Sequence, residues 1–422
     1  MIINSTVMNH KTLLNICAGL LLLSLIGCHS EDLLDGLTLR SNMNEKFYHQ
    51  NNEIAAKRLA TIMYNTKGSN RYERFKIVHI SDTHLSNYSP SNHFTNPINL
   101  KQSILFANQQ ELKINSVVAT GDFISNSDKQ LAVRYLESFV SNFYKENHIP
   151  SFLCTGNHDC NAIETIPNSF IYPHEMSQVL FTQQTYAIHK QYPNYYYADV
   201  SNPQGGTIRF IALDMLDQSG YEYNTLYYAS FSQEQINWLG NIALKENVTD
   251  QHSFIILTHY PFQPYTHNAS TYLCDGDFVH SWNMIPEIIE AFRSRTSIQK
   301  TYPNKLTAGK DISVDFDFKN SHGEFICYLG GHAHVTAQFN INGLGNRNSN
   351  LKPQKMLLCT NQAPSEKGKV YNRVERIEDS LSSNSFCIYA IDTKERKIHI
   401  TFFGAYKPTD HPDYQEFLVV EY

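Results

Sequence analysis

The chain has 422 residues, with 34 lysines and arginines against 40 aspartates and glutamates, so its formal net charge is -6 and its pI is near 6.3. Charged residues make up 18% of the chain and hydrophobic residues 41%, which excludes a polybasic nucleic-acid binder and a disordered acidic tail. With only 19 glycines and 15 prolines, collagen-like and low-complexity classes are excluded as well. The 19 histidines stand out, because imidazole is the commonest metal ligand among side chains.

The N-terminal residues predict an export signal. An apolar run, Leu13–Ile26, follows Lys11 and ends at Gly27 and Cys28. The run is shorter than the ~20 residues of a membrane-spanning helix, so residues 1–27 indicate a signal peptide. The small residue before Cys28 resembles the lipobox of bacterial lipoproteins, in which the cysteine carries the lipid. This resemblance implies an exported outer-membrane lipoprotein that faces the periplasm or the cell surface and contacts the membrane surface through lipidated Cys28. A soluble secreted protein is the alternative.

Residues 28–70 are polar and predict a tether that ends in one leading helix, Glu53–Tyr64. We assign residues 71–422 to a single domain. Six cysteines follow Cys28, and none of them forms a CxxC pair. We expect them to be structural, although an oxidising compartment allows disulfides; they are Cys154, Cys160, Cys274, Cys327, Cys359 and Cys387.

Short apolar runs that end in polar loops appear from Phe75 onward. They predict strands buried on both faces of a sheet, with helices covering it, and therefore an α/β fold. The runs are Lys76–Ile80, Ser116–Thr120, Ser151–Cys154, Ile208–Leu213, Phe254–Thr258 and Phe325–Gly330. Ser232 and Gln235 predict a capping box at the start of a helix over residues 233–246. Near the C-terminus, Phe386–Ile391 and Lys397–Phe403 predict a β-hairpin.

Residue types that bind metal ions follow five of these strands. They are Asp82 and His84; Asp122; Asn157, His158 and Asp159; His259; and His332 and His334. Ligands of open α/β sheets gather beyond the carboxyl ends of the strands, so we expect these side chains to converge. One such residue after a strand means little, whereas five in one chain are hard to obtain by chance.

This ordered set resembles the signature of the calcineurin-like binuclear metallophosphoesterases, over roughly Phe75–Tyr406. The resemblance implies a four-layer α/β/β/α sandwich of two mixed sheets flanked by helices, with two metal ions at the strand ends. Asp82, His84 and His334 would bind one ion. Asn157, His259 and His332 would bind the other, with Asp122 bridging. Such mixed donors suit first-row metals, and Mn, Fe and Zn all stay open.

The implied reaction is hydrolysis of a phosphate ester by a hydroxide that bridges the two metal ions and attacks phosphorus in line. His158 would stabilise the phosphoryl group and protonate the leaving alkoxide. Asp159 would either orient His158 or fix its loop.

The residues after Asp122 are Phe123, Ile124 and Ser125. The tyrosine ligand of purple acid phosphatases and the arginine of protein serine/threonine phosphatases are therefore missing. The long stretch Tyr265–Phe318 is an insertion that does not identify a substrate. We expect a small phosphate-ester substrate, a phosphomonoester or a phosphodiester, and no nucleic-acid partner. The alternatives are a cyclic-nucleotide phosphodiesterase, which export makes less plausible, and a catalytically silent metal-containing binding lipoprotein.

Overall fold

The computed structural model describes the chain from residue 73 to residue 422 with gaps. The described ranges are 73–85, 96–145, 147–161, 168–190, 194–217, 230–262, 266–267, 270–271, 281, 283–303, 310–334, 336–341, 353–359, 384–404 and 417–422. The predicted signal peptide, Cys28, the tether, the leading helix and Cys274 lie outside these ranges. No helix in the described part is long and apolar enough to cross a membrane.

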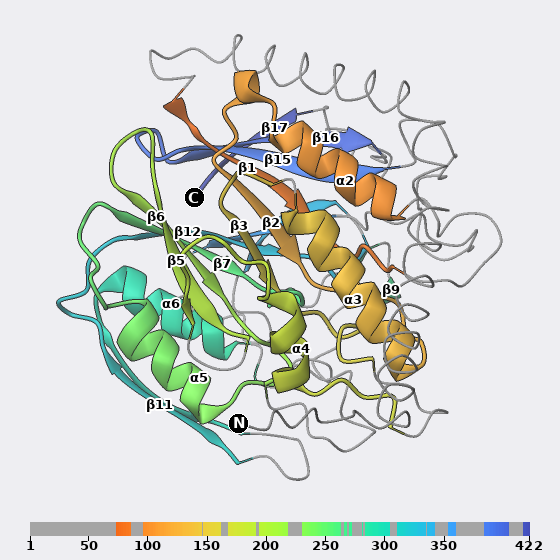
Figure 1. The fold of residues 1–422 in the computed structure, drawn as a ribbon. Helices are drawn as coiled ribbons and strands as arrows, with labels where there is room; N and C mark the ends of the chain where they lie inside the picture. Colours follow the sequence, from red (N-terminus) through yellow and green to blue (C-terminus); the bar gives the residue numbers. More distant parts are fainter. Residues whose placement is uncertain are drawn as a thin grey trace, which may run out of the picture. The chain divides into compact units, whose positions relative to one another are not determined.

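The first sheet has six strands in the order β17-β16-β15-β1-β2-β3 (Figure 1). β1 pairs in parallel with β2, and β2 with β3, whereas β15, β16 and β17 join in antiparallel pairs. Every residue of β1, β2 and β3 is buried, which explains why these strands read as continuous apolar runs. The strands are β1 (Phe75–Ile80), β2 (Ser116–Thr120), β3 (Ser151–Cys154), β15 (Ser385–Asp392), β16 (Lys397–Gly404) and β17 (Phe417–Glu421).

The second sheet has seven strands in the order β13-β14-β12-β7-β6-β5-β4. Its central strands β6, β7, β12 and β14 are parallel, and antiparallel strands complete both edges. Both sheets are therefore mixed. The strands are β4 (His189–Lys190), β5 (Tyr196–Ser201), β6 (Thr207–Ala212), β7 (His252–Leu257), β12 (Glu324–Gly330), β13 (Ala337–Ile341) and β14 (Gln354–Leu358).

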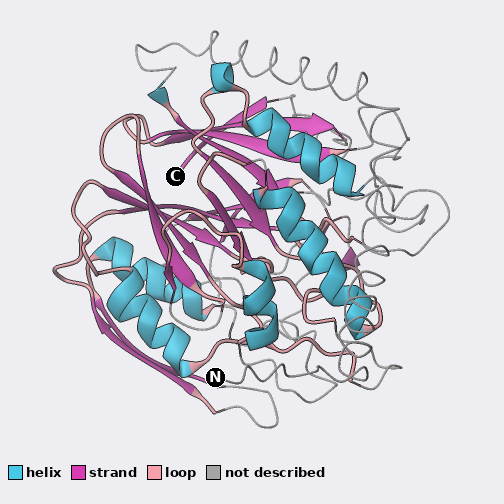
Figure 2. Cartoon of the chain, viewed as in Figure 1, coloured by secondary structure: helices cyan, strands magenta, loops and turns pink. Residues whose placement is uncertain are grey.

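The two sheets pack face to face. Phe75 and Val118 of the first sheet share one buried cluster with Phe210 and Ile255 of the second. A second cluster lies between the outer face of the first sheet and the helices α2 (Asn96–Ala107), α3 (Lys129–Tyr144) and α4 (Pro173–Leu180). Two helices and a pair of strands cover the outer face of the second sheet, namely α5 (Gln233–Trp238), α6 (Met284–Ser294), β10 (Ser297–Tyr302) and β11 (Ile312–Asp317). Figure 2 shows helices on both outer sides of the paired sheets. The predicted four-layer α/β/β/α fold is confirmed.

The helix predicted over residues 233–246 differs from the expectation in two ways. α5 ends at Trp238 and continues as one π-helical segment, Leu239–Ala243. Ser232 does cap the helix, because its hydroxyl accepts from the backbone N–H of Gln235 at 3.0 Å. The reciprocal bond of a capping box is absent, since the Gln235 side chain reaches Asp214 and Asp217 instead. The predicted box was therefore half right.

The structure also tests the predicted C-terminal hairpin and the predicted role of the cysteines. The C-terminal hairpin is confirmed as β15 and β16, which pair from Ser385–Gly404 to Asp392–Lys397. Three short elements that the sequence did not predict complete the described part, namely the 3₁₀ turn η3 (Gln110–Leu112) and the paired strands β8 (Thr266–His267) and β9 (Ser270–Thr271). The described cysteines are all buried free thiols: Cys154, Cys160, Cys327, Cys359 and Cys387.

Candidate metal centre

The residues that directly follow five strands, three in the first sheet and two in the second, lie close together in space. In the first sheet, β1 precedes Asp82 and His84, β2 precedes Asp122, and β3 precedes Asn157. In the second sheet, β7 precedes His259, and β12 precedes the two remaining histidines, His332 and His334. Seven donors therefore reach one site across the seam between two sheets, rather than along the edge of one.

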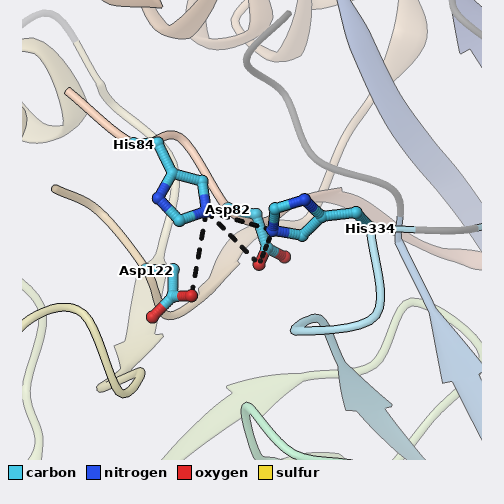
Figure 3. Close-up of side chains that lie close together, drawn as sticks. All are labelled: Asp82, His84, Asp122 and His334. Carbon is cyan, nitrogen blue, oxygen red and sulfur yellow. Dashed lines mark hydrogen bonds and ion pairs between the residues drawn. The ribbon is translucent and has the colours of Figure 1, made fainter. Parts of the chain in front are cut away.

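The first donor cluster contains Asp82, His84, Asp122 and His334. Figure 3 shows the His84 and His334 rings pointing toward the two carboxylates. His334 Nε2 lies 3.1 Å from Asp82 Oδ1, and His84 Nε2 lies 3.8 Å from Asp122 Oδ2. The two Nε2 atoms are 3.1 Å apart. Both carboxylates are almost fully buried, whereas the His84 and His334 side chains are 12% and 22% exposed, so solvent reaches this cluster from the histidine side.

The second donor cluster contains Asp122, His259 and His332. His259 Nε2 lies 3.2 Å from Asp122 Oδ2. The amide oxygen of Asn157 joins them, at 3.2 Å from His259 Nε2 and 3.0 Å from His332 Nδ1. Asp122 is the one residue that the two clusters share.

The donor atoms fit a cation. His259 Nδ1 lies 2.7 Å from the carbonyl oxygen of Thr120, which can only accept, so Nδ1 carries a proton. In neutral His259 the lone pair of Nε2 then faces oxygen atoms of Asp122 and Asn157, which are acceptors too. Three acceptors can converge only around a proton or a metal ion. This is the arrangement in which a backbone carbonyl fixes the tautomer of a metal-binding histidine.

The electrostatics of the site support the same conclusion. Burial lowers the pKa of His84 and that of His332 to about 3, so both rings are neutral and have a lone pair for a metal ion. Burial also lowers the pKa of His259, but the Asp122 carboxylate outweighs it and raises this pKa to about 9. A proton on His259 thus takes the place that a cation would occupy. Burial acts to raise the pKa of Asp122, but nearby histidines hold it well below its usual range.

The backbone at the strand ends is unusual. Five of the donors have positive φ, a conformation that is uncommon outside glycine and costs about 1–3 kcal/mol per residue. They are Asp82 (51°), His84 (48°), Asp122 (54°), His332 (65°) and His334 (51°). Glycines permit the close approach of the loops. A Cβ on Gly331 would lie 1.8 Å from Ser81 Oγ, and one on Gly121 would lie 2.7 Å from His259 Nδ1.

His158 lies beside the donor clusters and belongs to neither. Its ring centre is 4.9 Å from that of His84, and its backbone N–H donates to Asp122 Oδ1 at 2.8 Å. Asp159 instead fixes the loops that carry the donors. Its carboxylate accepts from the backbone N–H groups of Gly156 and Phe123 at 2.7 Å, Asp122 at 3.1 Å and Ile124 at 3.4 Å. Of the two roles considered for Asp159, these contacts favour fixing the loop.

The sequence did not point to several residues that support the donors. Ser81 donates to Asp82 Oδ2 at 2.5 Å, and Asn126 Oδ1 contacts His158 Nδ1 at 3.1 Å. Asp214 is fully buried and accepts from Thr155, which precedes the Asn157 loop, at 3.0 Å. Only the contact of Ser81 could have been inferred from the sequence, because this serine directly precedes Asp82. The other contacts join residues that are far apart in the chain.

Two mixed sheets with aspartate and histidine donors at their shared end define a protein with a candidate metal-binding site. A family model described as calcineurin-like phosphoesterase matches residues 75–336, which is more than half of the chain. The chain belongs to this family. Its Asp/His cluster indicates divalent metal ions. No curated protein matches the sequence.

Three solved structures are similar to the chain in fold. A purple acid phosphatase, PPD1 from yellow lupin (Lupinus luteus), has 11% identity and a TM-score of 0.42, and the match covers 82% of this chain and 53% of that protein. PhoD has 10% identity and a TM-score of 0.43, with coverages of 83% and 68%. The calcineurin-like phosphoesterase YfkN from Bacillus subtilis has 11% identity and a TM-score of 0.36, with coverages of 75% and 84%. This chain thus spans about half the length of the lupin phosphatase.

Proposed function

We propose that the chain is a binuclear metal-dependent hydrolase of small phosphate esters, either monoesters or diesters, that is exported and lipid-anchored. The observation that carries the hydrolytic part is that Asp122 belongs to both donor clusters. His84 Nε2 of the first cluster and His259 Nε2 of the second lie 3.8 and 3.2 Å from the same atom, Asp122 Oδ2, so this one carboxylate faces both cation positions. The side chain is buried, which keeps water away from Oδ2, while Oδ1 accepts from the backbone N–H of His158 at 2.8 Å.

The two clusters suggest which side chains bind each ion. Asp82, His84 and His334 would hold one ion with Asp122, and Asn157, His259 and His332 would hold the other. Nitrogen and oxygen donors without thiolates fit Mn, Fe or Zn. Bound ions of this kind supply hydroxide near neutral pH and neutralise the phosphate oxygens.

His158 is the residue that we assign to proton transfer. Its ring packs edge-on against that of His84, and its backbone N–H donates to Asp122 Oδ1. These contacts hold His158 next to the proposed ions, although it is not one of their ligands. It would stabilise the phosphoryl group and give a proton to the leaving oxygen. Asp159 would support it indirectly by holding the two loops together.

The export part of the proposal rests on the sequence, since Cys28 lies outside the described residues. The apolar run before Gly27 and Cys28 supports it. The test is incorporation of labelled palmitate into the expressed full chain. Cys28→Ser is expected to abolish labelling, and a labelled mutant would refute the anchor.

The hydrolytic part is tested with p-nitrophenyl phosphate and bis-p-nitrophenyl phosphate, each with added Mn²⁺ and after chelation. We expect turnover of at least one substrate that chelation abolishes and metal restores. His158→Ala is expected to keep both ions and lose about 10²–10³-fold in kcat on these esters, because its ring would no longer stabilise the phosphoryl group. The matched control is His322→Ala, because His322 is exposed and bonds only Asp250 among the described residues.

The outcomes separate the alternatives. Metal-dependent turnover that falls with His158→Ala but not with His322→Ala supports the proposal. Bound metal without turnover of either ester supports a binding lipoprotein. Preferential turnover of cyclic nucleotides, measured in the same buffer, would identify the phosphodiesterase alternative.

A further inference from the structure

Asn126 is the one described side chain outside the donor set that contacts the ring of His158 through a polar atom. The amide oxygen of Asn126 lies 3.1 Å from His158 Nδ1. A carbonyl-type oxygen can only accept a hydrogen bond, so this contact assigns a proton to Nδ1. Nε2 is then the ring nitrogen that exchanges a proton with a bound molecule.

The main chain around Asn126 is fixed on both sides. Before it, the backbone N–H of Ser125 donates to the carbonyl of Leu85 at 3.0 Å. After it, Ser127 forms two bonds with the side chain of Asn161: its N–H donates to Oδ1 and its carbonyl accepts from Nδ2, both at 2.8 Å. Asn161 is itself fully buried. Asn126 therefore extends from a segment that cannot move freely, which suits a residue that orients another side chain.

His158 is held from two directions as a result. Asp122 binds its backbone N–H and Asn126 binds its ring, so both the position and the rotation of the imidazole are set. The partner on the ring is a neutral amide. It fixes the tautomer without adding a third negative charge beside the carboxylates of Asp82 and Asp122.

We propose that Asn126 is a positioning residue that orients His158 so that Nε2 protonates the leaving oxygen of the phosphate ester. This inference rests on the proposed function. In the step concerned, the bond between phosphorus and the leaving oxygen breaks, its electron pair passes to that oxygen, and the oxygen takes the proton from Nε2. His158 starts the step protonated on both ring nitrogens and ends it neutral, with the Nδ1–H still donating to Asn126 Oδ1, and it regains the Nε2 proton from water.

The chemistry predicts a dependence on the leaving group. p-Nitrophenolate is stable as an anion and leaves with little help, whereas an alkoxide needs a proton as the bond breaks. Loss of orientation is therefore expected to affect alkyl esters far more than nitrophenyl esters. Loss of structure alone would reduce both by the same factor.

The test compares kcat of the metal-loaded protein on p-nitrophenyl, phenyl and ethyl esters of the class that the wild type turns over. Asn126→Ala is expected to lower kcat about 10- to 100-fold on the ethyl ester and less than about 3-fold on the nitrophenyl ester. Asn126→Asp keeps an acceptor oxygen and is expected to recover most of the loss. Adding Asn126→Ala to His158→Ala is expected to cost nothing further, because both changes remove one function. Asn142→Ala in α3 is the matched control.

A second readout does not depend on turnover. Long-range ¹H–¹⁵N NMR of the metal-loaded protein is expected to show His158 as the Nδ1–H tautomer, and Asn126→Ala is expected to give a mixture. Equal losses on all esters, full activity of Asn126→Ala, or an unchanged tautomer in that variant would overturn the role of Asn126 while leaving the proposed function intact. A wild type that turns over no ester would instead overturn the proposed function.

Discussion

The loop-fixing role of Asp159 gives a quantitative prediction. Its buried carboxylate accepts from four backbone N–H groups on two loops, three of them at 3.1 Å or less. Asp159→Ala removes all four acceptor contacts from a fully buried position. A buried N–H group without a partner costs about 1–3 kcal/mol. Because water can enter the space of the lost carboxylate, we expect a total loss of about 3–4 kcal/mol.

The assay is thermal unfolding of the metal-free protein in chelator, so that metal binding does not contribute to the difference. At about 2 °C per kcal/mol for a large domain, Asp159→Ala should lower the melting temperature by about 6–8 °C. Asp159→Asn should also destabilise, because its amide group places N–H donors against backbone N–H donors. Asp250→Asn, at an exposed aspartate, serves as the control and should change little.

Two results would refute this reasoning. A melting temperature within about 1 °C of wild type would show that the four contacts do not stabilise the loops. Unchanged stability combined with a large loss of turnover would show that Asp159 acts on His158 instead, which is the other role considered for it.

Three further predictions follow from the same geometry. Asp122→Asn should retain at most one metal ion per chain by mass spectrometry of the metal content; two retained ions would exclude a bridging role. The pKa of His259 is raised to about 9 in the cation-free protein, because the Asp122 carboxylate outweighs burial, so metal binding at pH 7.5 must displace a proton. Calorimetry in buffers of different ionisation enthalpy should therefore show proton release, and the apparent metal affinity should rise up to about pH 9 and level off above it; a pH-independent affinity would contradict the assignment. Asp214→Ala should destabilise by about 2–4 kcal/mol in urea unfolding, because it leaves the buried donors of Thr155 and Asn194 without this acceptor; an unchanged midpoint would show that the network is replaceable.

Much of the fold could be predicted from the sequence because fully buried strands leave a strong local signal. Ser116–Thr120 and Ser151–Cys154 have the predicted bounds, and Phe75–Ile80 begins one residue earlier than predicted. Each of these runs is apolar on both faces and ends in a polar loop. Such a pattern depends only on neighbours in the chain.

No local pattern in the sequence indicates how the strands are divided between two sheets. That part of the prediction came from the family resemblance. β3 and β6 are close in the sequence but belong to different sheets, whereas β1 pairs with β15 more than 300 residues later, as the contact of Phe75 with Ile391 shows. Pairing of this kind is decided by tertiary packing, which no local pattern records.

The candidate donor residues could be picked out from the sequence for a related reason, whereas the residues that support them could not. Aspartate and histidine directly after strands are recognisable by position. Asn126 and Asp214 act across 32 and 59 residues of chain, and one amide among many gives no indication of its partner. Gln235 shows the limit most clearly, because its spacing from Ser232 fitted a helix cap while its side chain binds Asp214.

The central claim is that two cations share the Asp122 carboxylate. Anomalous X-ray diffraction from metal-loaded crystals, collected on both sides of the absorption edge of the bound metal, tests it most directly. The account predicts two anomalous peaks about 3.5–4 Å apart, both in contact with the Asp122 carboxylate. A single peak, or two peaks of which one does not touch Asp122, would contradict it.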